Sequence, residues 1–320
     1  MARDNSIDSL KGFLIILVIV GHVITSLDNV NMINHAVMGL IYVFHMPLFI
    51  LISGYVTKRP DQQSATNMWK GILNILIPML IFHVLSATRL YIRHGDFCSS
   101  FVQFPYGILW YLMCLIYWRI ILYYTPKALL DRPYLHLSLA LVLSLLVGLT
   151  SIGNALAIHR ALNFYFFFLL GYYYREGALD ARWWNCNALH IAVAVVLLPL
   201  IFWLYPRCGT FLNGAENYSF ADIPQKALIL SCSIAMSLLV FNFRRDIPWL
   251  RQIGKDSLFY YLYHIHIISL IVFPIVEWYG LMRSFPFILL YSALVLGLVF
   301  LMGKVPFFRW LIRPTFKPSR

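Results

Sequence analysis

Long apolar stretches separated by short polar connections dominate the pattern of this chain. Each stretch approaches the roughly 20 residues that an α-helix needs to cross the hydrocarbon core of a bilayer. The ten stretches lie at residues 12–27, 37–56, 71–88, 107–124, 134–150, 159–174, 188–205, 226–243, 257–275 and 286–303. The pattern predicts an all-α fold, a polytopic integral membrane helix bundle with about ten transmembrane helices.

The predicted spans and their connections use most of the 320 residues. We therefore predict a single transmembrane domain over residues 1–320 and no separate soluble domain. No small-residue cleavage site follows the first stretch, so we expect an uncleaved anchor rather than a signal peptide. We find no internal repeat and no pair of broken helices of the kind that transporters carry. One bundle is the simplest architecture.

The composition excludes a soluble protein. The chain is 61% hydrophobic and 12% charged, against about 45–50% and about 25% for soluble domains. Its mean hydropathy of +0.74 means that apolar residues outnumber the positions that one globular core can bury, so most must face lipid or other helices. The five cysteines lack C-x-x-C or another metal spacing, so they indicate neither a metal site nor a disulfide framework.

The charge distribution predicts the orientation in the membrane. A net charge of +12 would suggest a nucleic-acid partner in a soluble protein. Here the excess of basic residues in cytoplasmic loops explains it without a ligand, so we expect no nucleic acid. With the N-terminus inside, 18 Lys and Arg lie in inside segments and 6 in outside segments, with Arg119 left within a span. We predict a multi-pass protein of the inner (plasma) membrane with both termini cytoplasmic.

Three polar residues share one face of the first predicted helix. Lys11 and His22 are eleven residues apart, an angular offset of only about 20°, and Asp8 precedes Lys11 by three residues. One interpretation is a snorkelling lysine in a surface ion pair, with a histidine bonded to a neighbouring helix. We favour a functional site, because ionisable groups inside a membrane are costly.

A second cluster lies in the next span. It contains the segment Phe44-His45-Met46-Pro47-Leu48-Phe49, then Ser53-Gly54-Tyr55, and ends in Lys58-Arg59. The segment adds an intramembrane imidazole, its proline frees a backbone carbonyl, and its Ser-Gly pair lets another chain or a ligand approach closely. A kinked packing helix would show the same features.

Other candidate residues lie later in the chain. His264 and His266 are about 200° apart on a helix and cannot form a metal pair, so we expect His264 to face the interior and His266 to pack. Trp110 and Tyr111 begin a middle span and are also typical of an interface belt. Arg119 either snorkels inward or reaches an anionic ligand, and we favour snorkelling. Three intramembrane histidines and a basic cytoplasmic rim suggest base chemistry with an anionic donor.

Taken in order, these motifs resemble the acyltransferase family 3 membrane proteins, and among them the fucose 4-O-acetylase-like branch. The matching segments are Ile7-Asp8-Ser9-Leu10-Lys11-Gly12-Phe13, Gly21-His22, Phe44 to Phe49, Ser53-Gly54-Tyr55, Trp110-Tyr111-Leu112, and Ser257-Leu258 to Tyr261 to His264. The ordered set is specific, whereas each motif alone is weak. Lys11 departs from the arginine that is common there, and Asn74 stands where a second basic residue is expected after Lys70.

The resemblance implies a ten-helix, acetyl-CoA-dependent O-acyltransferase that modifies a hydroxyl of a cell-surface polysaccharide or lipid-linked sugar. It implies one transmembrane acyltransferase domain without a permanently bound cofactor. The expected partners are acetyl-CoA as acyl donor, a sugar or lipid-linked glycan as acceptor, and the lipid bilayer. His22 would be the general base, or would form an acyl-histidine intermediate, while His45 would orient it or face the oxyanion.

The predicted site divides into catalytic and binding residues. Asp8 would position Lys11, and basic residues at the cytoplasmic mouth would attract the phosphates of coenzyme A. The predicted catalytic residues are His22, Lys11, Asp8 and His45, and the predicted substrate- or donor-binding residues are Ser53, Gly54, Tyr55, Lys58, Arg59, Lys70, Trp110, Tyr111 and His264.

A transporter or flippase of an amphiphilic sugar is the rival interpretation. In it the histidines relay protons or bind the sugar, and the sugar crosses the membrane without covalent change. The ordered motifs and the lack of broken-helix pairs favour the enzyme. A purely structural subunit leaves the buried polar residues unexplained.

Overall fold

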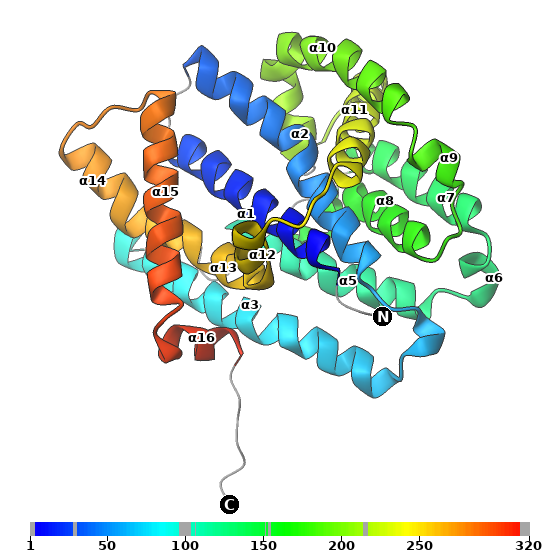
Figure 1. The fold of residues 1–320 in the computed structure, drawn as a ribbon, viewed down its shortest axis with the longest axis horizontal. Helices are drawn as coiled ribbons and strands as arrows, with labels where there is room; N and C mark the ends of the chain where they lie inside the picture. The colour runs from blue at the N-terminus through cyan, green and yellow to red at the C-terminus, as the bar shows by residue number, and fades with distance from the viewer. Residues whose placement is uncertain are drawn as a thin grey trace, which may run out of the picture. The chain divides into compact units, whose positions relative to one another are not determined.

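The protein is entirely helical over the part of the chain that the structure describes. This structure is a computed structural model, and it describes residues 4–27, 31–95, 104–105, 107–150, 152, 155–213 and 217–313. It is 84% helical, and no strand occurs among these residues. Figure 1 shows the arrangement of its helices.

Eight helical segments are long and apolar enough to cross a membrane, within the residues described. They are α1 (Asn5–Ser26), α2 (Met32–Tyr55), α3 (Ala65–His94), α5 (Trp110–Tyr124, preceded by η2, Gly107–Leu109), α8 (Ile158–Arg175, preceded by η4, Ala155–Ala157), α11 (Ile223–Asn242, preceded by η5, Phe220–Asp222), α13 (Ser257–Ile267, continued by η6, Ile268–Val272, and α14, Phe273–Trp278) and α15 (Phe285–Met302). Two shorter apolar segments lie in α7 (Pro133–Leu146, followed by η3, Val147–Leu149) and α10 (Asn187–Asn213). Each of the ten predicted stretches overlaps one of these, which confirms an all-α multi-pass membrane protein.

Short helices connect the spans, and the hydrophobic pattern did not predict them. They are η1 (Pro60–Gln62), α6 (Lys127–Leu130), α9 (Ala181–Trp184), α12 (Pro248–Lys255) and α16 (Pro306–Ile312). Their cause is local, because a proline occupies one of the first two helical positions of η1, α12 and α16. Proline is tolerated there, since the missing N–H would have no partner within the helix.

The chain divides into two compact units. Unit 1 comprises Met1–His45 and Phe243–Arg320, and unit 2 comprises Met46–Asn242. Helix α2 contributes its first part to unit 1 and its last part to unit 2. The single domain over residues 1–320 stays a prediction.

Unit 1 is built on the close packing of α1 against α12, with α13 and α15 also against α1 (Figure 1). A Cβ atom on Gly12 would lie 2.0 Å from the backbone oxygen of Leu250, and one on Gly254 would lie 1.7 Å from that of Asp8. Only glycine lets the two backbones approach this far. The glycine of the first motif is therefore a packing residue.

Ser9 fastens the start of α12 to α1. Its Oγ accepts a hydrogen bond from the backbone N–H of Ile247 at 3.0 Å and donates to the backbone oxygen of the same residue at 3.2 Å. Leu250 and Ile253 are buried, whereas Arg251 pairs with Asp246 at 2.7 Å on the other side of the helix. This amphipathic pattern is typical of a helix that lies at a membrane surface.

Unit 2 contains a second close crossing, between the end of α2 and α8. A Cβ atom on Gly54 would lie 1.8 Å from the backbone oxygen of Phe168, and one on Gly171 would lie 1.9 Å from that of Leu51. Around this crossing α7 and α5 pack against α8, α3 packs against α5, and α10 runs beside α11 (Figure 1). The predicted close approach at Ser53-Gly54 is thus made by another segment of the same chain.

Candidate functional site

Two imidazole rings from helices far apart in the sequence meet in unit 1. Helix α1 carries His22 and α13 carries His264, with ring centroids 5.2 Å apart and ring planes inclined by 39°. His264 is fully buried and His22 is half-buried, while His266 is half-buried on another side of α13. The interior position predicted for His264 is confirmed. The pairing itself was not predicted, because it depends on the packing of α1 against α13.

The hydrogen bonds of two histidines determine which ring nitrogen carries the proton. In His264, Nδ1 lies 3.0 Å from the backbone oxygen of Tyr260, and in His45, Nδ1 lies 2.8 Å from that of Ile41. A carbonyl oxygen only accepts, so Nδ1 must be the protonated nitrogen in each neutral ring. The Nε2 atoms are then left with a lone pair, and that of His264 has no hydrogen-bond partner among the described residues.

His45 completes a group of three imidazoles in unit 1. It is buried on α2, and its ring meets that of Tyr42 edge to face at a centroid distance of 5.0 Å. Both His45 and His264 interact electrostatically with His22. His45 is thus a third imidazole of unit 1, and its Nε2, like that of His264, keeps a lone pair that can accept a proton.

A π-helical turn follows His264. Residues Ile268–Val272 form this wider turn, within the span that runs from α13 into α14. In the same region Ser269 Oγ donates a hydrogen bond to the backbone oxygen of Ile265 at 2.7 Å. Single π-helical turns inside α-helices occur frequently at functional sites. No hydrophobic pattern distinguishes such a turn, so it was not predicted.

The ion pair predicted on α1 is present. Lys11 Nζ lies 3.4 Å from Asp8 Oδ1, and the two side chains are 22% and 3% exposed respectively. Asp8 also lies in the part of α1 that packs against α12, since its backbone oxygen faces Gly254. The carboxylate thus holds the ammonium group near the start of α1, while the cytoplasmic position of this end stays a prediction. Contact of Lys11 with a phosphate stays a prediction.

In unit 2 the second motif brings Ser53 and Tyr111 together. Their hydroxyl oxygens are 2.7 Å apart, and both residues are buried. Ser53 Oγ also donates to the backbone oxygen of Phe49 at 2.9 Å. Because this bond uses the only proton of the serine hydroxyl, Tyr111 donates to Ser53. Two residues predicted separately thus form one hydrogen-bonded pair.

The other predicted aromatic residues of unit 2 pack against rings. Tyr55 meets Phe241 at a centroid distance of 5.5 Å, and Trp110 stacks on Phe164 at 5.6 Å. The guanidinium of Arg160 lies 5.0 Å from the centre of the Trp110 ring. Binding of substrate by Tyr55 or Trp110 stays a prediction.

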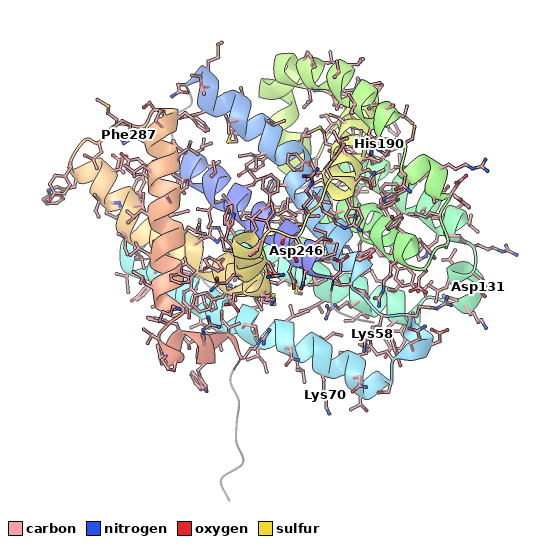
Figure 2. All side chains as sticks on the ribbon, in the orientation of Figure 1. Lys58, Lys70, Asp131, His190, Asp246 and Phe287 are labelled. Atoms are coloured by element: carbon pink, nitrogen blue, oxygen red, sulfur yellow. The ribbon has the colours of Figure 1, made fainter. Side chains whose placement is uncertain are left out.

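The predicted donor-binding cations have different environments. Lys58 lines a pocket in unit 2, whereas Lys70 is exposed and projects from α3 (Figure 2). Arg59 pairs with Asp61 at 3.2 Å and with Glu176 at 3.4 Å. Partial burial lowers the pKa of Arg59, but Asp61, Tyr172 and Glu176 outweigh this effect and the pKa is raised. The charge of Arg59 is therefore already balanced by carboxylates.

Comparison with known proteins adds a family and two relatives. The model of a family described as an acyltransferase domain (Acyl_transf_3) matches residues 4–304. Nodulation protein NolL of Sinorhizobium fredii (strain NBRC 101917 / NGR234) is 37% identical over 91 residues, which are 27% of this chain and 25% of that protein. Nodulation protein NolL of Mesorhizobium japonicum (strain LMG 29417 / CECT 9101 / MAFF 303099) is 37% identical over 90 residues, 26% of this chain and 24% of that protein. The match thus spans about a quarter of these relatives. No solved structure matches the chain significantly.

Proposed function

Because this chain belongs to the acyltransferase family 3 membrane proteins, whose model matches residues 4–304, we propose that it is a membrane O-acyltransferase. We propose acetyl-CoA as the donor and a hydroxyl of a cell-surface polysaccharide or lipid-linked sugar as the acceptor. The family confirms the broader part of the resemblance that the motifs indicated. The resemblance to the fucose 4-O-acetylase-like branch is the finer part and stays a prediction, and the sugar acceptor is proposed from it.

The observation that carries this proposal is the meeting of His22 with His264. A transferase that acylates a hydroxyl needs a base near neutral pKa, and imidazole is the side chain best suited to that task. Here two imidazoles lie 5.2 Å apart between their centroids, inside a part of the protein that crosses a membrane. Ionisable groups in such positions are costly and are usually functional.

The proposed reaction is a direct transfer with His22 as general base. His22 takes the proton of the acceptor hydroxyl while the hydroxyl oxygen attacks the carbonyl carbon of the acetyl thioester. A C–O bond forms, the tetrahedral adduct collapses and the C–S bond breaks. The imidazolium then returns the proton to the thiolate, so coenzyme A leaves as a thiol. The competing version passes through acetyl-histidine.

The neighbouring histidines have supporting roles in this proposal. Since Nδ1 of His264 is held by the backbone oxygen of Tyr260, its Nε2 is available to accept a hydrogen bond near His22. His45, whose Nδ1 is held in the same way, would orient His22 or face the developing oxyanion. Holding both rings through backbone carbonyls keeps them in fixed orientations, which favours a preorganised site.

The donor would enter from the cytoplasm. The bias of 18 against 6 basic residues supports this orientation, with both termini on the cytoplasmic side of the inner membrane. Acetyl-CoA is made and kept inside cells as a soluble anion, so basic residues of the inner segments would attract its phosphates. The acceptor is either modified there or reached by passage of the acetyl group through the bundle.

The test is transfer of radiolabelled acetyl groups by the purified, detergent-solubilised protein. Label should move from acetyl-CoA to host glycans, and His22→Ala should reduce the rate by at least about 100-fold, the usual contribution of a general base. His266→Ala is the matched control, because it removes another half-buried imidazole. Elution as a single peak in gel filtration would show that each variant is folded.

Two results would contradict the proposal. Full transfer by a stably folded His22→Ala variant would exclude this histidine as the base. Neither binding nor turnover of acetyl-CoA by the unaltered protein, together with movement of an unmodified sugar across vesicles, would favour the transporter interpretation.

A further inference from the structure

A pocket of about 310 Å³ lies in unit 2 at the end of α2, next to η1, α3 and α5. Its size is at the lower end of the range for small-molecule sites, about 300–1,000 Å³. Its polar lining comes from four separate segments of the chain. Besides Tyr123, these polar residues are Thr57, Lys58, Gln62, Gln63, Asn67 and Arg119. No Asp or Glu is among the described residues that line it.

Arg119 is the central cation of this pocket. Its Nη1 lies 3.5 Å from the position that a Cβ atom on Gly71 would occupy, so the guanidinium rests against a part of α3 that carries no side chain. Its Nε is buried and has no hydrogen-bond partner among the described residues. A cation taken from water without a counterion is costly. The position therefore favours an anion that none of the described residues supplies.

The surroundings of Arg119 strengthen the preference for an anion. Lys58 adds a second positive charge, and neither it nor Arg119 forms an ion pair within the described residues. The nearby carboxylates of Asp61 and Glu176 are already paired with Arg59. Asn67 belongs to the first turn of α3, a helix of 30 residues whose N-terminus carries partial positive charge.

We propose that Arg119 and Lys58 form the binding site for the phosphate groups of a soluble nucleotide acyl donor. This proposal rests on the proposed function, which supplies the donor, and it identifies the groups that recognise the donor's anionic end. The guanidinium offers a planar fork of donors that matches phosphate oxygens, and the ammonium adds a point charge. Snorkelling of Arg119 alone, which the sequence favoured, does not account for a guanidinium that lines a pocket and whose Nε is buried without a partner among the described residues.

A phospholipid headgroup offers the same phosphate chemistry from another source. The pocket favours the nucleotide because three amide side chains, Gln62, Gln63 and Asn67, line it from the connection and the helix start rather than from a lipid-facing helix surface. An amide side chain both donates and accepts hydrogen bonds, so it can bind the polar groups of a nucleotide next to its phosphates. The experiment therefore distinguishes a bound nucleotide from a bound lipid headgroup.

The experiment measures binding of coenzyme A to the full chain in nanodiscs of phosphatidylcholine, by calorimetry. We expect coenzyme A to bind at least 100-fold more tightly than pantetheine, which lacks phosphate. Arg119→Gln should weaken binding of coenzyme A at least tenfold and leave pantetheine unchanged, because only the phosphates lose a partner. Arg119→Lys should recover part of the loss.

Lys127→Gln is the matched control. This residue is exposed at the start of α6, close in sequence to Arg119, and it does not line the pocket. We expect its affinity for coenzyme A to stay within twofold of the unaltered protein. If Arg119→Gln fails to fold, Lys58→Gln and Arg119→Lys provide the same comparison, since both keep most of the packing.

The proposal is overturned if Arg119→Gln and Lys58→Gln bind coenzyme A within twofold of the unaltered protein. It is also overturned by a second pair of results. Coenzyme A would not bind in neutral nanodiscs, and added phosphatidylglycerol would stabilise the unaltered protein but not Arg119→Gln. The pocket would then hold a lipid headgroup. Acetyl transfer is measured separately. A normal rate of acetyl transfer by Arg119→Gln refutes only this site. If the unaltered protein binds coenzyme A but transfers no acetyl group, and Arg119→Gln weakens that binding, the site is supported and the proposed function is refuted.

Discussion

His264 shows how the role of a single residue depends on which of its atoms are already bonded. Its Nδ1 lies 3.0 Å from the backbone oxygen of Tyr260, so the ring cannot turn without losing this bond. Its Nε2, in contrast, has no partner among the described residues and belongs to a ring 5.2 Å from that of His22. A buried polar atom without a partner costs free energy unless a ligand satisfies it.

This leads to a prediction for His264→Asn. An asparagine amide N–H can replace the bond from Nδ1 to Tyr260, but the shorter side chain has nothing in place of Nε2. We expect normal expression and a fall in the rate of acetyl transfer of at least about tenfold, which is less than the roughly 100-fold expected for the base itself because His264 only assists it. Steady-state kinetics measure this, with His266→Asn as the control. Equal rates in both variants would show that Nε2 of His264 takes no part.

Local and long-range residue partners differ in how far the sequence reveals them. The pair of Asp8 and Lys11 was predictable, because three residues of helix place the two side chains side by side. The surroundings of Arg119 were not predictable, because its neighbours Lys58 and Gly71 come from other elements. The absence of any carboxylate within three or four residues of Arg119 was the one available signal.

At the scale of elements, small residues determine which helices touch. Gly12 with Gly254 joins α1 to α12, and Gly54 with Gly171 joins α2 to α8. In membranes, where lipid is as apolar as the helix surfaces, such close backbone contacts are a main source of helix association. Two of these four glycines, Gly12 and Gly54, lie in the motifs that carry the family resemblance, so these motifs have a structural role besides the catalytic role proposed for them.

Gly54→Ala tests this role. Its Cβ atom would lie 1.8 Å from the backbone oxygen of Phe168, and backbone cannot move aside as a flexible side chain can. We expect a loss of about 1–3 kcal/mol in the free energy of unfolding, as for other overpacked sites, seen as a lower thermal midpoint in detergent.

Gly297→Ala is the matched control for this prediction. Gly297 lies on α15, and a Cβ atom there would meet open space. In a helix interior, alanine is more favourable than glycine by about 0.5–1 kcal/mol, so this variant should be at least as stable as the unaltered protein. A Gly54→Ala variant that unfolds at the same temperature as Gly297→Ala would contradict the close crossing.

At the scale of the whole molecule, the length and composition of the chain determined the class of protein. The ten apolar stretches each appear as a helix, and eight reach the length and hydropathy of a span among the residues described. The ends of the helices were less predictable. Helix α3 begins at Ala65 and ends at His94, beyond the apolar stretch 71–88, because hydrogen bonding continues where hydropathy has already fallen.

The orientation in the membrane can be tested by labelling single cysteines. In a background without the five native cysteines, Gln62→Cys should be protected from a membrane-impermeant maleimide in intact cells, and Met282→Cys should react. The reason is the bias of basic residues toward the inside, which places Gln62 within and Met282 outside. Both side chains are exposed in the structure, so access is governed by the membrane. The reverse pattern would show that the N-terminus faces outward.

The sequence by itself determined that this is an all-α membrane protein, which helices carry the polar residues, and to which family it belongs. These properties depend on composition, on helical period and on motifs within one segment, all of which are local. Only the tertiary structure decided that His22 meets His264, that Ser53 bonds to Tyr111, and that Arg119 lines a pocket with no Asp or Glu among its described residues. Such contacts join helices far apart in the chain, and the small residues and side-chain shapes that select them act only once the helices pack together.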